Sequence, residues 1–117
     1  YSDKMIPDTT VPYSDNLGGT TQLADAWTAC GHPEKARTML RGLAKVSGQY
    51  LEWYINYSHD DVTSNTKNCN FSMSDFLAAA QGMIKTGDPE GKRLLQKATN
   101  YYMQLRQKGV NVELTVN

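Results

Sequence analysis

The sequence has no net charge and no long apolar run. Twelve Lys and Arg residues balance twelve Asp and Glu residues in a chain of 117 residues. Neutrality removes the electrostatic basis for binding nucleic acid or an anionic membrane surface. No run of about 18 apolar residues occurs, so we expect no direct membrane insertion. A signal peptide is also missing, and the chain starts with Tyr1. We interpret it as an excised or processed piece of a longer protein.

Residues for catalysis and metal binding are equally scarce. No phosphate loop, dinucleotide fingerprint or metalloprotease helix is present. Of the two cysteines, Cys30 is expected as a buried thiol and Cys69 as an exposed one, and the count leaves their pairing open. His59, Asp60 and Asp61 could join Cys69 around a metal, but the spacing matches no zinc pattern. No nucleophile elbow supports a catalytic role. We therefore predict no catalytic residue, metal or cofactor.

The apolar residues recur at spacings of three and four, which predicts helices. Four such segments cover residues 17–30, 33–57, about 72 or 74 to 86, and 88–108. The expected buried faces, in chain order, are Leu23, Ala26, Trp27 and Cys30; Ala36, Leu40, Leu43, Val46, Tyr50, Trp53 and Tyr54; Phe76, Leu77, Ala80, Met83 and Ile84; and Leu94, Leu95, Ala98, Tyr101, Tyr102 and Leu105.

The remaining segments lack helical periodicity. Residues 1–16 contain two prolines and many turn formers, and are predicted to form an extended connector. Residues 58–71 are mostly polar and predict a loop. The tail, 110–117, alternates apolar and polar residues, as a short strand does. It could pair with residues 9–11, pair with a neighbouring chain, or be disordered.

An internal repeat is the main positive signal. The segment GHPEKAR at 31–37 aligns with GDPEGKR at 87–93, and an Ala-rich segment precedes each. Such self-similarity indicates a repeat architecture. We therefore predict an all-α fold with two stacked antiparallel helix hairpins, 17–57 and 72–109, in a domain spanning 17–109.

The first of these units resembles a tetratricopeptide repeat. The resemblance rests on the LADAW segment at 23–27 and on Gly31, Glu34, Lys35 and Ala36. It implies an α-α superhelix fragment that binds a protein or peptide. The second unit departs from the pattern at Gly91, and the 56 residues between the two corner glycines exceed the family's period of about 34.

Most of the chain also resembles the soluble C-terminal tail of large bacterial multi-pass membrane proteins. The similarity lies in DKMIP at 3–7, VPY at 11–13, the LADAW and GHPEKA segments, and YLEWY at 50–54. These proteins, long of unknown function, are grouped with protein O-mannosyltransferase-like enzymes. The resemblance implies an accessory domain on the extracytoplasmic face of the inner membrane, which contacts a protein partner or the membrane part of its own chain. Without it, a free-standing cytoplasmic adaptor is expected.

The aromatic residues have two interpretations. They could pack between the hairpins with hydroxyls reaching water, or form a partner-binding surface, where Tyr and Trp are frequent. Both could hold for different faces of one helix. The candidates for partner binding are Tyr50, Trp53, Tyr54, Tyr57, Tyr101 and Tyr102.

Overall fold

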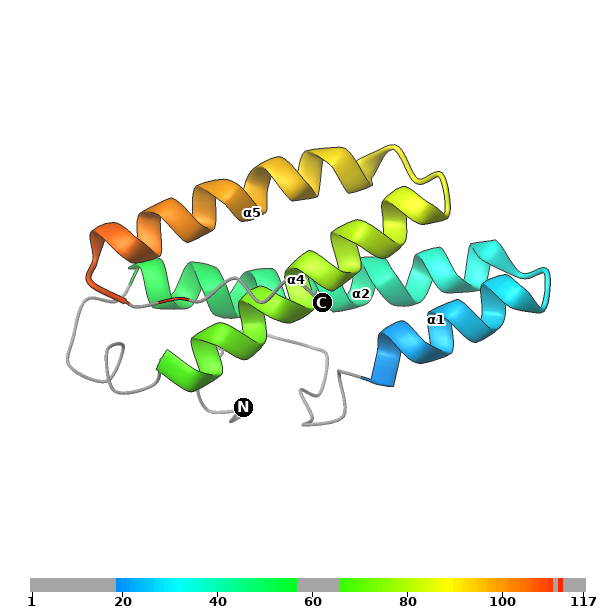
Figure 1. Ribbon diagram of the computed structural model, residues 1–117, viewed down its shortest axis with the longest axis horizontal. Coiled ribbons are helices and arrows are strands. Elements are labelled where there is room, and N and C mark those ends of the chain that lie inside the picture. Colours follow the sequence, from blue (N-terminus) through cyan, green and yellow to red (C-terminus); the bar gives the residue numbers. More distant parts are fainter. Residues whose placement is uncertain (1–18, 57–65, 111, 113–117) are drawn as a thin grey trace.

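The structure is a computed structural model that describes residues 19–56, 66–110 and 112 (Figure 1). These residues form the helices α1 (Gly19–Ala29), α2 (Pro33–Asn56), α4 (Thr66–Lys85) and α5 (Glu90–Gln107). No strand occurs among them, so the predicted all-α fold is confirmed. The predicted connector at 1–16 lies outside the described residues.

The helices form two antiparallel hairpins that pack against each other. Helix α1 pairs with α2, and α4 pairs with α5. The hairpins meet mainly through α2 and α4, while α5 runs in the same direction as α2 and touches it sparsely (Figure 1). Large side chains from three helices fill the common core, among them Leu43, Tyr50, Leu51, Tyr54, Met73, Phe76, Met83 and Leu105.

The two predicted glycine corners have the same backbone geometry. Gly31 and Gly87 adopt φ angles of 85° and 77°, in the left-handed region that glycine enters without steric cost. In each corner the glycine N–H donates to a carbonyl at 3.1 Å, and the N–H of the next residue donates to a carbonyl at 2.8 Å. These two bonds define the Schellman motif that ends a helix. The repeat found in the sequence therefore corresponds to a repeated structural corner.

The departure of the second unit at Gly91 has a steric cause. A Cβ atom at Gly91 would lie 2.8 Å from the backbone nitrogen of Ile84 and 3.1 Å from the carbonyl oxygen of Ala80. Helix α5 thus approaches the α4 backbone too closely for a side chain. The first unit has Lys35 here, whose Nζ lies over the Trp27 ring, 4.2 Å from its centroid.

Helix α4 begins earlier than predicted. The polar composition of 58–71 predicts a loop there, but α4 starts at Thr66. Cys69, four residues before Met73 and seven before Phe76, continues the buried stripe toward the N-terminus and is itself buried. Tertiary burial of that stripe outweighs the low helix propensity of its polar neighbours. The prediction of an exposed Cys69 in a loop was therefore wrong.

The predicted buried face of the first helix was also wrong. Leu23 is 57% exposed, and Ala26 and Cys30 are exposed too. Ala24 faces the core instead, with Trp27 partly buried beside it. Helix α1 packs mainly on α2, and a small buried side chain such as Ala24 permits close approach of two helices.

The other predicted faces hold with few exceptions. All seven residues predicted for the second helix are buried except Trp53, which is partly buried. Leu77 and Tyr102 are also partly buried, and Ile84 and Leu95 are each 38% exposed.

The end of α5 repeats the corner geometry once more. Gly109 has a φ of 83°, and Val110 N–H donates to the Leu105 carbonyl at 3.1 Å. Val110 and Val112 are buried. Neither belongs to a strand, so the predicted C-terminal strand finds no support there, and the rest of the tail lies outside the described residues.

Candidate partner-binding groove

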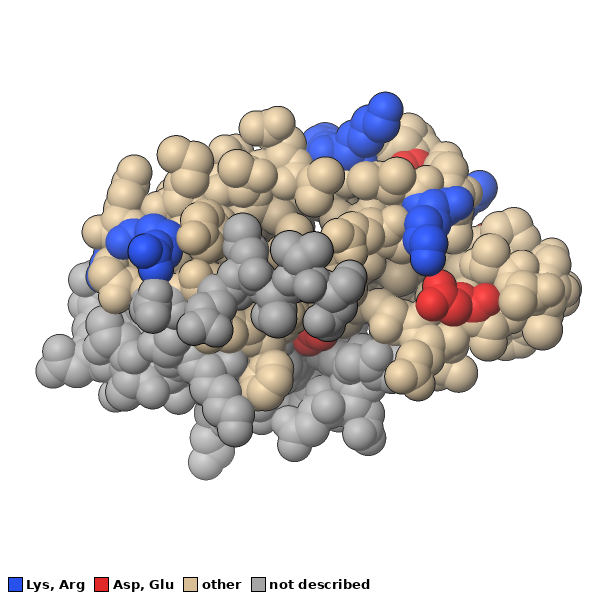
Figure 2. All heavy atoms as spheres, viewed as in Figure 1, with Lys and Arg blue, Asp and Glu red and all other residues tan. Residues whose placement is uncertain are grey.

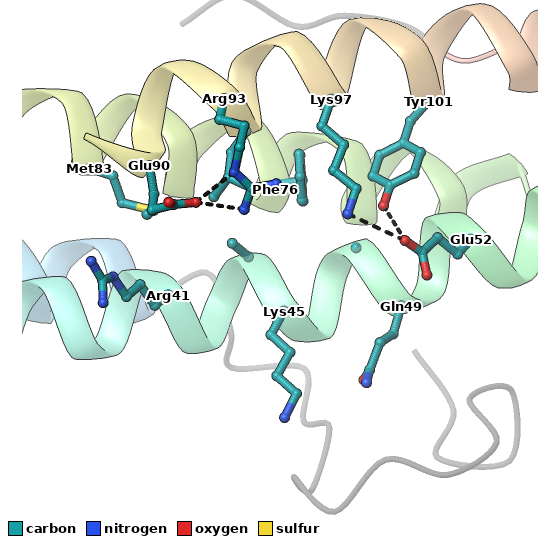
Figure 3. Close-up of a pocket in the computed structure, with 13 residues that line it drawn as sticks. Arg41, Lys45, Gln49, Glu52, Phe76, Met83, Glu90, Arg93, Lys97 and Tyr101 are labelled. Atoms are coloured by element: carbon teal, nitrogen blue, oxygen red, sulfur yellow. Dashed lines mark hydrogen bonds and ion pairs between the residues drawn. The ribbon is translucent and has the colours of Figure 1, made fainter. Parts of the chain in front are cut away.

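A groove of about 540 Å³ lies between α2 and α5. Helix α4 runs behind α2 and α5 in Figure 3 and contributes Phe76 and Met83 to the floor of the groove. We call it the α2–α5 groove. Its lining residues are Arg41, Ala44, Lys45, Gly48, Gln49, Glu52, Phe76, Met83, Glu90, Arg93, Leu94, Lys97 and Tyr101.

The rim of the groove is charged, and its carboxylates are paired. The Glu90 carboxylate accepts from Arg93, with an Nη2–Oε2 distance of 2.6 Å. Glu52 lies 3.6 Å from the Lys97 ammonium and accepts a 2.5 Å hydrogen bond from the Tyr101 hydroxyl. Figure 3 shows Arg93, Lys97 and Tyr101 extending from α5 toward α2. The contacts of Glu52 link the α2 wall to the α5 wall, whereas the Glu90–Arg93 pair lies within α5.

The floor of the groove is apolar and depends on a glycine. Phe76 packs edge-to-face on Tyr101, with ring centroids 5.4 Å apart. A Cβ atom at Gly48 would lie 3.2 Å from the Phe76 ring. Gly48 therefore lets the ring lie directly against the α2 backbone, which is the close helix contact that glycine permits. Burial, together with the Glu52 hydrogen bond, raises the pKa of Tyr101 above its ordinary value.

One end of the groove is closed by an ion pair between the hairpins. Arg41 donates from Nε and Nη2 to the two Asp88 carboxylate oxygens, at 2.8 and 3.1 Å. The Asp88 side chain is fully buried, and it also accepts from the Glu90 backbone N–H at 3.0 Å. These donors, Arg41 first, hold the pKa of Asp88 below its ordinary value. Nearby, Arg37 donates to the Thr86 carbonyl at 2.8 Å.

A second, smaller groove of about 420 Å³ lies between α1 and α4. We call it the α1–α4 groove. Its lining includes Leu40, Gly82, Asp25 and Lys85. A Cβ atom at Gly82 would lie 2.9 Å from the Leu40 side chain, so glycine again permits the close packing of two helices.

Five of the six predicted partner-binding aromatics lie in the described part of the chain, and they fall into three groups. Tyr50 and Tyr54 are fully buried, so their rings belong to the core and present no surface to a partner. Tyr101 is 6% exposed and lines the α2–α5 groove. Trp53 and Tyr102 are partly buried against the core. Tyr57 lies outside the described residues.

The sequence interpretation missed the basic residues of the groove. Arg41, Lys45, Arg93 and Lys97 each line it, although none was a candidate. The sequence does contain a signal for them, because residues four apart on a helix share one face. This spacing applies to Arg41 and Lys45 on α2 and to Arg93 and Lys97 on α5. The net charge of the chain does not reveal these basic residues, because acidic residues elsewhere cancel them in the sum.

The cysteines and histidines form no reactive cluster in the described part of the chain. Cys30 and Cys69 are both free thiols, and Cys30 is exposed, contrary to the prediction of a buried thiol. Burial raises the pKa of the Cys69 thiol to about 12. No group of three or more His, Cys, Asp or Glu residues able to hold a metal occurs among the described residues. His59, Asp60 and Asp61 lie outside them.

The charged side chains on the face of the molecule drawn in Figure 2 form separate groups. Figure 2 shows basic residues over the α4–α5 corner and the end of α5, with uncharged surface between them.

None of the described helices combines the length and apolarity required to cross a bilayer. No protein-family model, curated protein or solved structure matches the chain.

Proposed function

We propose that this chain is a non-catalytic helical interaction domain that binds a peptide segment of a protein partner. The α2–α5 groove carries this proposal, since a rigid concave surface with an apolar floor and a charged rim is the usual form of a peptide-binding site. The groove is built on helices that share one core, so its shape exists before binding and little ordering is needed.

The groove carboxylates are poorly suited to catalysis. A general acid at neutral pH needs a raised pKa, which burial near other acids produces. Glu52, Glu90 and Asp88 instead each lie beside a basic side chain, and the pKa of Asp88 is lowered. This pairing supports a structural and binding role for the acids of the rim.

The sequence resemblance supplies the wider setting of the proposal. In it, the domain is the soluble C-terminal part of a membrane-anchored glycosyltransferase-like protein, on the extracytoplasmic face of the inner membrane, and its partner is a protein or the membrane part of the same chain. The alternative is a free-standing adaptor of tetratricopeptide type. The full-length reading frame separates the two, because only the first requires hydrophobic spans before Tyr1.

Selection from a random peptide library displayed on phage tests the binding function. The full chain serves as bait, and selected peptides are then titrated into the isotopically labelled protein. The Gly48 and Gly82 amide signals report on the α2–α5 and α1–α4 grooves, respectively. We expect selected peptides to shift the Gly48 signal. Absence of any enriched peptide, or binding that shifts neither glycine, would contradict the proposal.

A further inference from the structure

We infer that the α2–α5 groove binds an extended acidic peptide with Asp or Glu at alternate positions. The inference rests on the proposed binding function and names the chemistry of the ligand. Its basis is the local charge. Four basic residues, Arg41, Lys45, Arg93 and Lys97, line the groove, and they face three carboxylates, those of Glu52, Glu90 and the Asp88 that holds Arg41 at one end. A chain that is neutral overall therefore presents a local excess of one positive charge.

The cations differ in how firmly they are held. Arg41 is fixed by Asp88 at the end of the groove. Lys45 is exposed and makes no ion pair with the described residues, and Figure 3 shows it extending away from α5 on a flexible stem. Lys97 is 3.6 Å from Glu52, a longer contact than that between Arg93 and Glu90. An incoming carboxylate can pair with Lys97 without breaking a short hydrogen bond, and the Lys45 side chain would have to turn toward α5 to reach it.

The spacing of the cations fits an extended chain. Residues four apart on a helix are separated by about 6 Å along its axis. This separation applies to Arg41 and Lys45 on α2, and to Arg93 and Lys97 on α5. Alternate side chains of an extended peptide are about 6.6 Å apart and lie on one side. Acidic residues at alternate positions therefore match the axial spacing of Arg93 and Lys97 on the α5 wall.

The length of the groove sets the length of the peptide. From Arg41 to Glu52, α2 rises about 16 Å, which an extended chain covers in about five residues. The carboxylates Glu90 and Glu52 lie toward opposite ends of the groove. They would repel the evenly spaced phosphates of a nucleic-acid strand, whereas a short peptide places its acids between them. An acidic peptide is thus favoured over an oligonucleotide.

A labelled peptide pair tests the inference on the full chain. The probe is a fluorescein-labelled heptapeptide with glutamate at its second, fourth and sixth positions and leucine between them. Its control has glutamine in place of each glutamate. Fluorescence polarisation should show about tenfold or greater loss of affinity for the glutamine peptide, because the charge-assisted hydrogen bonds are removed. The Gly48 amide signal should shift with the acidic peptide, and the Gly82 signal should not.

A matched pair of charge variants locates the site. Arg93→Gln with Lys97→Gln should weaken binding of the acidic peptide about tenfold or more. Lys92→Gln with Lys108→Gln removes the same charge from exposed positions outside the groove, and should change affinity less than about twofold. Equal losses in both variants would show nonspecific attraction and overturn the inference.

The remaining outcomes distinguish the two proposals. Equal binding of both heptapeptides, or equally tight binding of a labelled oligothymidylate, would overturn the acidic-peptide inference. So would an acidic peptide that does not bind. If peptides from the phage library still shift the Gly48 signal in any of these cases, the interaction function stands without the acidic specificity. Circular dichroism of each variant checks that a loss of binding is not a loss of folding.

Discussion

The ion pair between Arg41 and Asp88 joins the two hairpins, so removing the Asp88 carboxylate should destabilise the fold. Asp88→Ala abolishes two hydrogen bonds from the guanidinium and one from the first turn of α5. The lost helix-capping bond costs about 1 kcal/mol. The lost charge-assisted contact with Arg41 costs about 1.5 kcal/mol, the low end of its range, because the exposed arginine regains water.

The sum, about 2.5 kcal/mol, predicts a measurable shift in the thermal midpoint. The entropy of unfolding scales with chain length and is about 0.25 kcal/mol per kelvin for 117 residues. A loss of about 2.5 kcal/mol therefore lowers the thermal midpoint by about 10 °C. Far-UV circular dichroism during heating near pH 7 measures it. The matched control is Glu34→Ala, which removes an exposed acid at the corresponding corner. It should leave the midpoint nearly unchanged.

The pH dependence separates an electrostatic contribution from a packing defect. Asp88 has a lowered pKa in the folded state. The ionised carboxylate therefore stabilises the fold above the unfolded pKa of about 3.9, and this contribution is lost as the pH falls through the folded-state pKa. The difference between wild type and Asp88→Ala should shrink below about pH 4. A shift in the thermal midpoint of under about 2 °C near pH 7, or a shift of unchanged size in acid, would contradict a stabilising role of the Asp88 carboxylate.

Three further predictions follow from local geometry. Gly42→Ala should raise the free energy of unfolding by about 1 kcal/mol, because no atom lies near the added Cβ and alanine favours the helix. Gly91→Ala should lower the free energy of unfolding by about 1–3 kcal/mol, because the added Cβ would overlap the α4 backbone. Urea denaturation measures both changes. Cys30 should be alkylated by iodoacetamide in the native protein and Cys69 only after unfolding, as mass spectrometry of the intact chain would show. Tyr101→Phe should cost about 1 kcal/mol in urea denaturation through the lost hydrogen bond, and an unchanged midpoint would contradict that role.

The sequence predicts most of the fold because its strongest signals are local. The spacing of the glycine and proline residues at 31–34 and 87–90 identifies both corners, and the apolar periodicity of α2 identifies its buried face. These features depend on neighbours within one or two turns. The long α4 and the face of α1 were predicted wrongly because packing between helices decides them. Cys69 is buried by contacts far away in sequence, which no local pattern contains.

The candidate groove was not predictable from composition, because it depends on which charged side chains the packed helices bring together. The periodicity of α2 buries its apolar residues and leaves Arg41 and Lys45 exposed. The corner at Gly87 returns α5 parallel to α2, so Arg93 and Lys97 come to line the same hollow. Gly48 lets Phe76 close the floor without filling the space above it. A neutral sum over the chain is therefore compatible with a locally basic site, and only the helix arrangement shows where the excess lies.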